Sequence, residues 1–187
     1  DFNLLIENDV LKMFREIKPN IVVHLAALVG GVHHNIDEPV RYLEENILRN
    51  TFVLKESYKN NVERFTGILS SCIYPDKITN YPIKEEKLFD GAPHKDLFSY
   101  SYAKRCMAIQ IDMYKKKYKK NYNYLIPCNL YGEFDKFDSV KGHFVGALIQ
   151  KIIDAKKNNS NSITLFGDGT PFRQFMHAKD LAKIINE

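Results

Sequence analysis

Ile21-Val22-Val23-His24-Leu25-Ala26-Ala27 is the stretch that decides the fold. It is too short and too rich in β-branched residues for a helix, and it is apolar on both faces, which is typical of a strand buried in a parallel sheet. Similar runs return at residues 65–71 and 122–130. Amphipathic helices are expected between them, over residues 38–60 and 98–119. Strands alternating with long helices predict an α/β fold.

The connections complete this pattern. Residues 28–36 and 132–142 carry glycine and polar residues and are expected to be loops, and residues 144–157 are expected to be a helix. Short strands are expected at 163–166 and 172–176, followed by a helix from residue 178. The three strand–loop–helix units predict half of a doubly wound, Rossmann-type parallel sheet, in which ligands bind beyond the carboxyl ends of the strands.

Composition narrows the functional classes. The chain has 187 residues, of which 44% are hydrophobic, enough for a globular core. Cys72, Cys106 and Cys128 form no CxxC pair, so we expect neither a disulfide framework nor a zinc site, and a reducing, cytoplasmic compartment. No run reaches the roughly 18 apolar residues that a membrane-spanning helix needs, so no membrane partner is expected.

Two other clusters receive structural interpretations. The lysines at 115–117 contribute to a net charge of +4, but they close a predicted helix, where cations suit the helix dipole, so no nucleic-acid partner is expected. His33, His34 and Glu38 do not complete a ligand set, so no metal site is expected.

A tyrosine–lysine pair is the first candidate for chemistry. Tyr100 and Lys104 are four residues apart at the start of a predicted helix, so they share one face. A cation there is expected to favour the phenolate and to lower the pKa of the tyrosine. Ser70 and Ser71 end the preceding strand. A hydroxyl, a tyrosine and a lysine at the carboxyl edge of a parallel sheet form the constellation of the short-chain dehydrogenases.

Several motifs carry a sharper resemblance. In order and spacing the chain is similar to the extended, nucleotide-sugar-modifying short-chain dehydrogenases/reductases of the NAD-dependent epimerase/dehydratase family, and within them to the GDP-L-fucose synthases. The matching stretches are His24–Ala27, Val29–Gly31, Ser70–Pro75, Tyr100–Lys104, Pro127–Gly132, His143 at the start of a helix, and Phe166–Pro171 followed by Arg173.

This resemblance implies a reaction in two stages on GDP-4-keto-6-deoxy-D-mannose. First, the two carbons that flank the ketone are inverted, with Cys72 and His143 as base and acid. Then NADPH reduces the ketone, with Tyr100 donating a proton, Lys104 holding the nicotinamide ribose and Ser70 bonding the carbonyl oxygen. Ser71 is an alternative to Ser70, because neighbours on a strand point to opposite sides.

The resemblance also implies ligand-lining residues. Lys151, Phe166 and Arg173 match positions that meet the GDP-sugar, although Phe166 departs from the tryptophan expected there. Most of the NADP(H)-lining positions are equally explained as core strand, with the exception of Asn129. Those positions are Leu25, Ala26, Ala27, Ile68, Leu69, Ser70, Ser71, Tyr100, Lys104, Pro127, Cys128, Asn129, Leu130 and His143.

Domain organisation follows from the same resemblance. Residues 1–142 are expected to be part of an NAD(P)-binding Rossmann-type domain, and residues 143–187 part of a smaller substrate-binding region that returns to the core domain. The start at Asp1 and the helical pattern at the end lead us to expect a central fragment that lacks the N-terminal glycine-turn unit and is inactive in isolation. The helices near 38–60 and 98–119 are expected to form a homodimer.

Three functional hypotheses therefore remain open. The main one is GDP-L-fucose synthesis. The nearest alternative is another nucleotide-sugar epimerase or a 4,6-dehydratase, which would not need Cys72 and His143. The third is an inactive fragment or a pseudoenzyme that binds a nucleotide sugar.

Overall fold

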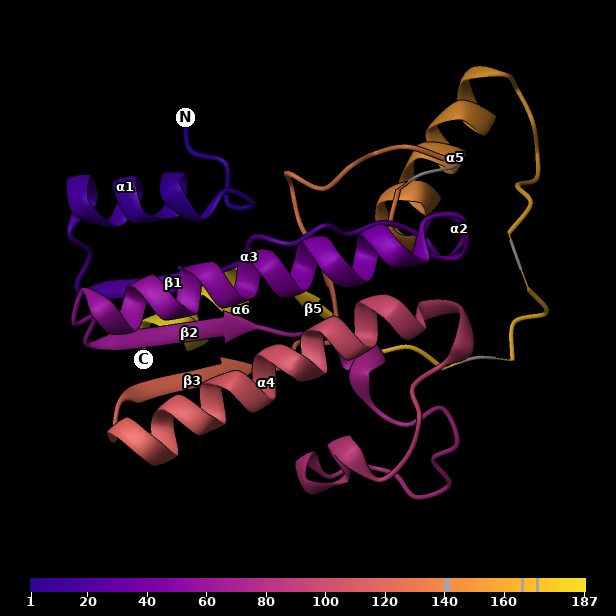
Figure 1. Cartoon of the computed structure of the whole chain (residues 1–187). Coiled ribbons are helices and arrows are strands. Elements are labelled where there is room, and N and C mark those ends of the chain that lie inside the picture. Colours follow the sequence, from indigo (N-terminus) through magenta and orange to yellow (C-terminus); the bar gives the residue numbers. More distant parts are fainter. Residues whose placement is uncertain (140–141, 166, 171) are drawn as a thin grey trace. The chain divides into compact units, whose positions relative to one another are not determined.

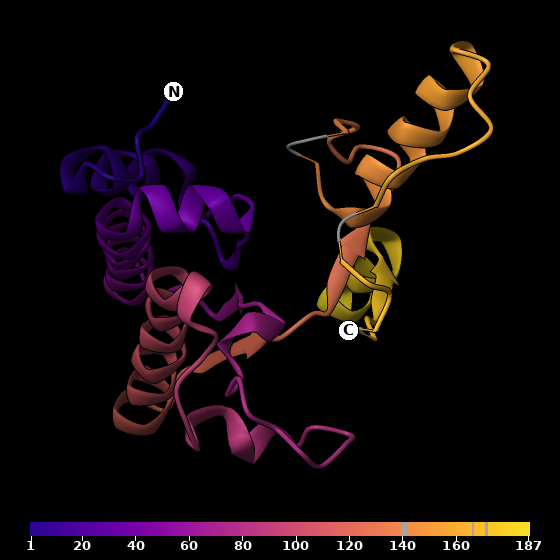
Figure 2. The ribbon, with the colours of Figure 1, turned by 90° about the vertical axis from the view of Figure 1, so that its right-hand side faces the viewer.

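The computed structural model describes residues 1–139, 142–165, 167–170 and 172–187. They form two compact units, Asp1–Pro127 and Cys128–Glu187 (Figures 1 and 2). Each unit is described by itself.

The first unit is built on a parallel sheet of three strands. They are β1 (Ile21–His24), β2 (Arg64–Ile68) and β3 (Asn121–Leu125), in the order β1-β2-β3. Ile21 pairs with Arg64, which in turn pairs with Asn121. The predicted strands near residues 21, 65 and 122 are therefore neighbours in a parallel sheet, as expected.

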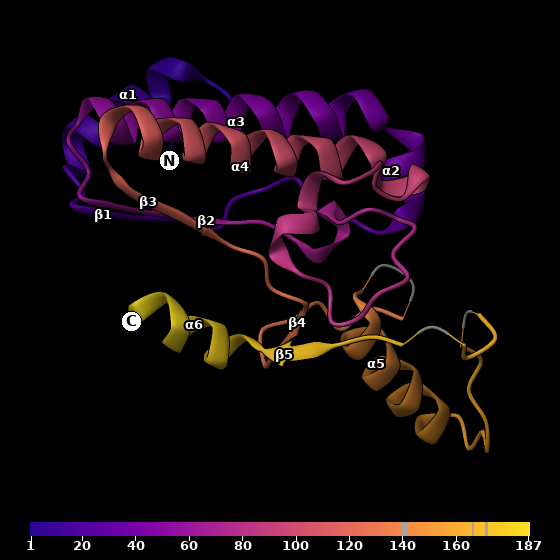
Figure 3. The same ribbon diagram turned by 90° about the horizontal axis from the view of Figure 1, so that it is seen from below.

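Three helices cover one face of this sheet, namely α1 (Glu7–Ile17), α3 (Pro39–Lys59) and α4 (Phe98–Tyr118) (Figures 1 and 3). Strand residues alternate, so that Phe65 and Tyr122 are fully buried in the core. Gly67 brings α4 close to β2, because a Cβ there would lie 2.5 Å from the end of the Met107 side chain. The buried side chains of the strands and of the three helices therefore pack into one hydrophobic core.

The second unit is smaller. Its two strands, β4 (Asn129–Tyr131) and β5 (Phe175–His177), are parallel, and its helices are α5 (Phe144–Lys157) and α6 (Ala178–Asn186). β5 runs directly into α6, where the Nδ1 atom of His177 accepts a hydrogen bond from the backbone N–H of Lys179 at 3.2 Å.

Some predicted elements were wrong. The expected strand 122–130 is two strands in different units, and Pro127, which lies between them, has no N–H to donate to a ladder. The expected loop 28–36 contains a short helix, α2 (Val32–Asp37), whose Asn35 side chain donates to the carbonyls of Gly30 and Gly31. Residues 163–165 form no strand, and residue 166 lies outside the described residues. The expected strand 172–176 is shorter and lies at 175–177.

Short 3-10 helices occupy the connection from β2 to α4. They are η1 (Ser71–Ile73), η2 (Glu85–Phe89) and η3 (Lys95–Leu97). Within the described ranges, none of the helices is long and apolar enough to cross a membrane.

Candidate active site

The carboxyl end of β2 carries the first group of predicted residues. The ladder to β3 continues one residue past β2, where the N–H of Leu69 donates to the carbonyl of Leu125 at 2.9 Å. Ser70 then adopts an extended conformation and precedes η1, which carries Ser71 and Cys72. Ser70 and Cys72 are half-buried, whereas Ser71 is exposed.

The first turns of α4 bring the tyrosine–lysine pair to this strand end. Lys104 is only 2% exposed, and its Nζ atom donates to the carbonyl of Ile68 at 2.7 Å. The same atom lies 5.8 Å from the centre of the Tyr100 ring. The four-residue spacing therefore places both side chains beside the end of β2, as a shared helix face requires.

Burial dominates the electrostatics of the pair. It lowers the pKa of Lys104 to about 8, with a smaller opposing effect from Cys72 and a further lowering by Arg49. Burial also raises the pKa of Tyr100, with Cys72 and Tyr42 adding to the effect. The expectation that the pKa of this tyrosine is lowered was wrong, because burial has the largest influence on it and raises it. A raised pKa keeps the phenol protonated and able to donate.

Cys72 belongs to the same group. Ser101, the neighbour of Tyr100 on α4, donates from its hydroxyl to the backbone carbonyl of Cys72 at 3.0 Å, and Cys72 also influences the pKa values of Tyr100 and Lys104. Thiol, phenol and ammonium thus converge from η1 and α4 in the first unit, with Ser70 two residues ahead of the thiol. Two acids and a cation at one strand end are able to move protons at a bound carbonyl compound.

The end of β1 supplies the adjoining loop. Leu25 is exposed, and Ala26 and Ala27 are half-buried. Asn46 of α3, which is fully buried, holds this loop through both backbone groups of Leu28: its Oδ1 accepts from the N–H at 2.8 Å, and its Nδ2 donates to the carbonyl at 3.1 Å. Sequence reasoning missed Asn46, although an amide inside the apolar stripe of a predicted helix was a usable signal.

His24 is the second buried group on β1. It is 3% exposed, and its Nε2 atom lies 2.9 Å from Oδ1 of Asn50 on α3. Burial lowers the pKa of His24 to about 4; Asn50 opposes this, whereas Lys104 and Arg49 add to it. This histidine is therefore neutral in the folded protein and serves the structure.

The protein should consequently lose stability in mild acid. His24 binds its proton near pH 6.5 when unfolded but only near pH 4 when folded, so its contribution is complete above pH 6.5 and lost as the pH falls to about 4. The free energy of unfolding should therefore fall by about 3 kcal/mol between these two pH values. Urea unfolding from pH 4 to 7 measures it, and His24→Gln should flatten the dependence. The exposed His33→Gln is the control, and equal slopes in the two variants would rule out this role.

The second unit carries the other predicted residues near its first strand. Cys128 and Leu130 are half-buried, and Asn129 is exposed with its Nδ2 atom donating to the carbonyl of Gln174 at 3.0 Å. Pro127 is the last residue of the first unit. In this structure the side chain of Asn129 holds the segment that leads into β5.

His143 immediately precedes α5 and is exposed. Its Nδ1 atom lies 3.7 Å from Oδ1 of Asp135. The other carboxylate oxygen of Asp135 is buried without a hydrogen-bond partner among the described residues. A carboxylate at this distance is a neighbour that can orient the imidazole ring. Asp135 was missed because it lies in a loop without periodicity.

The predicted substrate residues lie farther along the second unit. Lys151 donates from Nζ to the carbonyl of Thr164 at 2.7 Å. Arg173 is exposed, with its Nη1 atom donating to the carbonyl of Phe172 at 3.1 Å. Phe166 lies outside the described residues.

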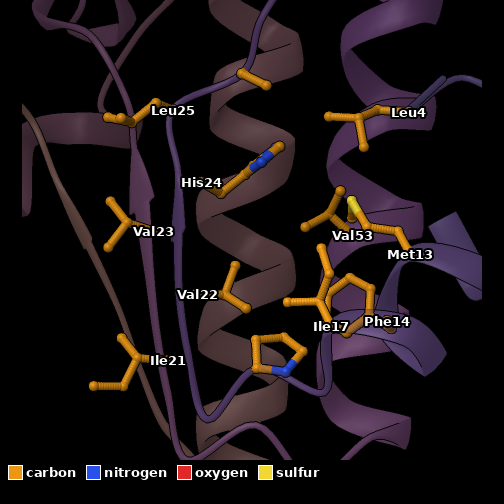
Figure 4. A pocket seen from close by; sticks show the side chains of 12 residues that line it. Leu4, Met13, Phe14, Ile17, Ile21, Val22, Val23, His24, Leu25 and Val53 are labelled. Atoms are coloured by element: carbon orange, nitrogen blue, oxygen red, sulfur yellow. The ribbon is translucent and has the colours of Figure 1, made fainter. Parts of the chain in front are cut away.

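A cavity of about 340 Å³ lies elsewhere, along β1 and beside α1 (Figure 4). Its wall is apolar, with Phe14, Val22 and Leu25 among its side chains, and His24 is its one ionisable lining residue. Leu25 and Ala26 are shared with the predicted cofactor lining. Neither Cys72, Tyr100 nor Lys104 lines it, so this cavity is not where the reactive groups converge.

Metal ligands do not gather in the parts of the chain that the structure describes: no group of three or more His, Cys, Asp or Glu side chains has the arrangement of a metal site. The three cysteines are free thiols.

Comparison with known proteins assigns this arrangement to a class. Residues 1–186 match the model of the NAD dependent epimerase/dehydratase family, and the chain belongs to this family. It is 39% identical over 183 residues to the GDP-L-fucose synthase of Dictyostelium discoideum, covering 98% of this chain and 57% of the relative. It is 37% identical over 179 residues to the probable GDP-L-fucose synthase of Drosophila melanogaster, covering 92% and 56%.

The fold agrees with these sequence matches. A crystal structure of a GDP-L-fucose synthetase from Naegleria fowleri bound to NADP superposes with a TM-score of 0.86 at 35% identity, covering 97% of this chain and 59% of that one. The predicted fold class, part of a Rossmann-type parallel sheet, is confirmed. The chain spans just over half the length of the curated relatives it matches, 56% and 57%.

Proposed function

We propose that the protein makes GDP-L-fucose from GDP-4-keto-6-deoxy-D-mannose, by epimerisation at the two carbons that flank the ketone followed by NADPH-dependent reduction. The observation that carries this proposal is that the first turns of α4 hold Tyr100 and Lys104 against the end of β2 and the backbone of Cys72. The reduction requires a tyrosine and a lysine. The epimerisation requires a base as well, and a thiol beside this pair can supply it. The similarity to GDP-L-fucose synthases of two organisms supports the same substrate.

In the first stage, Cys72 as thiolate removes a proton from a carbon next to the ketone, and the charge passes to the ketone oxygen as an enediolate. An acid then returns a proton to the opposite face of that carbon. We assign this acid to His143, which has Asp135 beside its Nδ1 atom. Repeating the exchange at the other flanking carbon completes the inversion of both centres.

In the second stage, Tyr100 donates its proton to the oxygen of the ketone as that oxygen gains negative charge, and Ser70 hydrogen-bonds the same oxygen. NADPH, when bound, supplies the hydride. The residues at β2 fit such a cofactor: the Lys104 ammonium has three N–H groups, and the described residues use one of them, at Ile68, in hydrogen bonding. The remaining donors suit ribose hydroxyls. Ser71 remains the alternative to Ser70.

The remaining ligand-lining assignments are part of the same proposal. The ends of β1, β2 and β4 would line the cofactor, and Lys151, Phe166 and Arg173 would meet the GDP-sugar. Arg173 is exposed and suited to a diphosphate, which a guanidinium binds through two N–H groups. Residues 1–142 would be the cofactor domain and 143–187 the start of the substrate region.

Product analysis with the full-length protein tests the proposal. Supplied with GDP-4-keto-6-deoxy-D-mannose and NADPH, it should form GDP-L-fucose and consume one NADPH for each product molecule. A 4-epimerase would consume no NADPH overall, and a 4,6-dehydratase would act on a sugar that is not yet oxidised. Binding of the nucleotide sugar without turnover would identify a pseudoenzyme.

We further propose a homodimer formed through α3 and α4. Two apolar side chains on α4 support it: Ile109 and Met113 are one turn apart and are 48% and 52% exposed, respectively. Val40 and Leu48 are exposed on α3. Apolar stripes on two neighbouring helices suit a two-fold interface.

Light scattering should therefore report a dimer for the full-length protein. Ile109→Glu with Met113→Glu should give a monomer, because charges would be buried in the interface. Lys12→Glu, a change at an exposed position of α1, is the control and should leave the dimer intact. A monomeric unmodified protein would contradict the proposal.

We also propose a cytoplasmic location. Its support is that the three cysteines are free thiols, as is usual in a reducing compartment.

A further inference from the structure

The loop that follows β1 begins beside the candidate site. The register of the parallel sheet places the end of β1 next to Ile68, whose carbonyl accepts the hydrogen bond from Lys104. Residues 25–30, which we call the β1 loop, then lead to Gly31, the residue before α2. Ligands of parallel sheets bind beyond the carboxyl ends of the strands. The β1 loop therefore lies where a ligand of this sheet is expected.

One side chain of α3, Asn46, fixes the middle of this loop. Its Oδ1 atom accepts from the N–H of Leu28 at 2.8 Å and from Nη1 of Arg49 at 3.2 Å. Its Nδ2 atom donates to the carbonyls of Leu28 at 3.1 Å and of Tyr42 at 2.8 Å. An amide has two N–H groups and two acceptor lone pairs, and all four are used here. Asn46 is fully buried, so loss of its amide would take the partners from both backbone groups of Leu28.

A second contact restricts the same loop. A Cβ at Gly30 would overlap with the hydroxyl of Tyr42, which is 4% exposed and has little room to move away. At Gly31, by contrast, no atom of the described residues lies within 4 Å of where a Cβ would be. The Nδ2 atom of Asn35 also donates to the carbonyl of Gly30, at 3.3 Å. Buried side chains of α2 and α3 thus hold the backbone of the β1 loop at Leu28 and at Gly30.

We propose that the β1 loop must keep this position to bind NADP(H), and that Asn46 is the positioning residue that holds it there. Asn46 touches neither cofactor nor substrate and acts through the backbone of Leu28. The inference rests on the proposed function, in which NADPH is the hydride donor and the end of β1 lines it. A loop that already has its binding conformation loses less conformational entropy when the ligand binds, so releasing the loop lowers the affinity.

Titration of the full-length protein with NADPH, followed by the fluorescence of the reduced nicotinamide, measures the Kd and needs no turnover. Asn46→Ala should raise this Kd about tenfold, because the released loop has to be ordered again on binding. Asn50→Ala is the matched control and should stay within about twofold of the unmodified protein. Asn50 is likewise buried on α3 and bonded to β1, but its Oδ1 atom meets the ring of His24 and not the loop.

Turnover gives a second readout, which a general loosening of the fold would not reproduce. Asn46→Ala should raise the KM for NADPH while kcat at saturating NADPH stays within about twofold of the unmodified value, because Asn46 touches no reacting atom. A fall in kcat with an unchanged KM would contradict the positioning role.

A second pair of variants displaces the loop without changing Asn46. Gly30→Ala introduces the overlap with Tyr42 and should raise the Kd for NADPH about fivefold or more. Gly31→Ala places its methyl group in open space and should leave the Kd unchanged.

Equal Kd values in folded Asn46→Ala and Asn50→Ala would overturn the role of Asn46, and equal values in the two glycine variants would overturn the role of the loop. Circular dichroism establishes folding; if Asn46→Ala does not fold, the glycine pair decides. A full-length protein that binds NADPH but forms a product other than GDP-L-fucose would contradict the proposed function alone, because the four Kd values would still test Asn46 and the loop. A protein that binds no NADPH would overturn both.

Discussion

Tyr100→Phe in the full-length protein is expected to lower the rate of NADPH consumption by about two to four orders of magnitude while the substrate carbons still exchange protons with solvent. The phenol is half-buried beside Lys104, and burial raises its pKa, so it holds its proton until the ketone oxygen becomes basic enough to take it. Phenylalanine keeps the ring and loses only that proton.

Cys72→Ser is the complementary change in the same experiment. A serine hydroxyl is far too weak an acid to ionise as a thiol does, so deuterium incorporation at the flanking carbons should fall at least about a hundredfold. The hydride step would then act on the uninverted ketone. Mass spectrometry for deuterium, run beside NADPH absorbance, separates the two stages. Equal exchange in the unmodified protein and in Cys72→Ser would remove Cys72 from the mechanism.

Lys104→Met should have the second-largest effect, a loss of reduction of about a hundredfold or more, because it removes the buried cation beside Tyr100 and the bond to the Ile68 carbonyl. Methionine suits the buried site in size, so the fold should persist. Cys106→Ala, a change on the same helix, is the control and should retain near-normal turnover.

In the unmodified protein, the rate of reduction should likewise depend on pH through the ammonium of Lys104. Burial lowers the pKa of Lys104 to about 8, so the group is charged below that pH and neutral above it. The rate of reduction should therefore decline as the pH rises through about 8. A flat profile between pH 7 and 10, or a normal rate in Lys104→Met, would show that the ammonium has no part in the hydride step.

Regular periodicity made much of the fold predictable from the sequence. The apolar run at residues 21–27 and the stripes of the two long helices led to the parallel sheet and to helices that end within a residue or two of α3 and α4. These elements are recognisable because burial against a common core imposes spacings of two and 3.6 residues.

The prediction failed where a single residue, instead of a repeating pattern of apolar residues, determines the local structure. β3 ends at Leu125 and β4 begins at Asn129, with Pro127 between them, so the one strand expected here is two strands in different units. The short helix α2 depends on one amide, Asn35, that satisfies the carbonyls of two preceding glycines. Neither event has a repeating pattern.

The site divides in the same way. That Tyr100 and Lys104 lie close together was predictable, because helical spacing places them on one face. The supporting residues Asn46 and Asp135 were not, because each acts through a contact with a residue distant in the sequence or in a loop. The influence of burial on Tyr100 also needs the packed structure, since desolvation has no signature in residue spacing.

The position of β2 between its two neighbours has a consequence for local unfolding of the first unit. A central strand has hydrogen-bonding partners on both sides, whereas β1 and β3 each have one strand neighbour among the described residues. Local opening starts at edges, where fewer bonds must break, and reaches a central strand only when most of the unit unfolds. Ser70 and Cys72 follow shortly after the end of β2, and Lys104 donates a hydrogen bond to the carbonyl of Ile68, the last residue of this strand. Among these three strands, the amide hydrogens of β2 should therefore exchange most slowly, and the candidate site is attached to that strand.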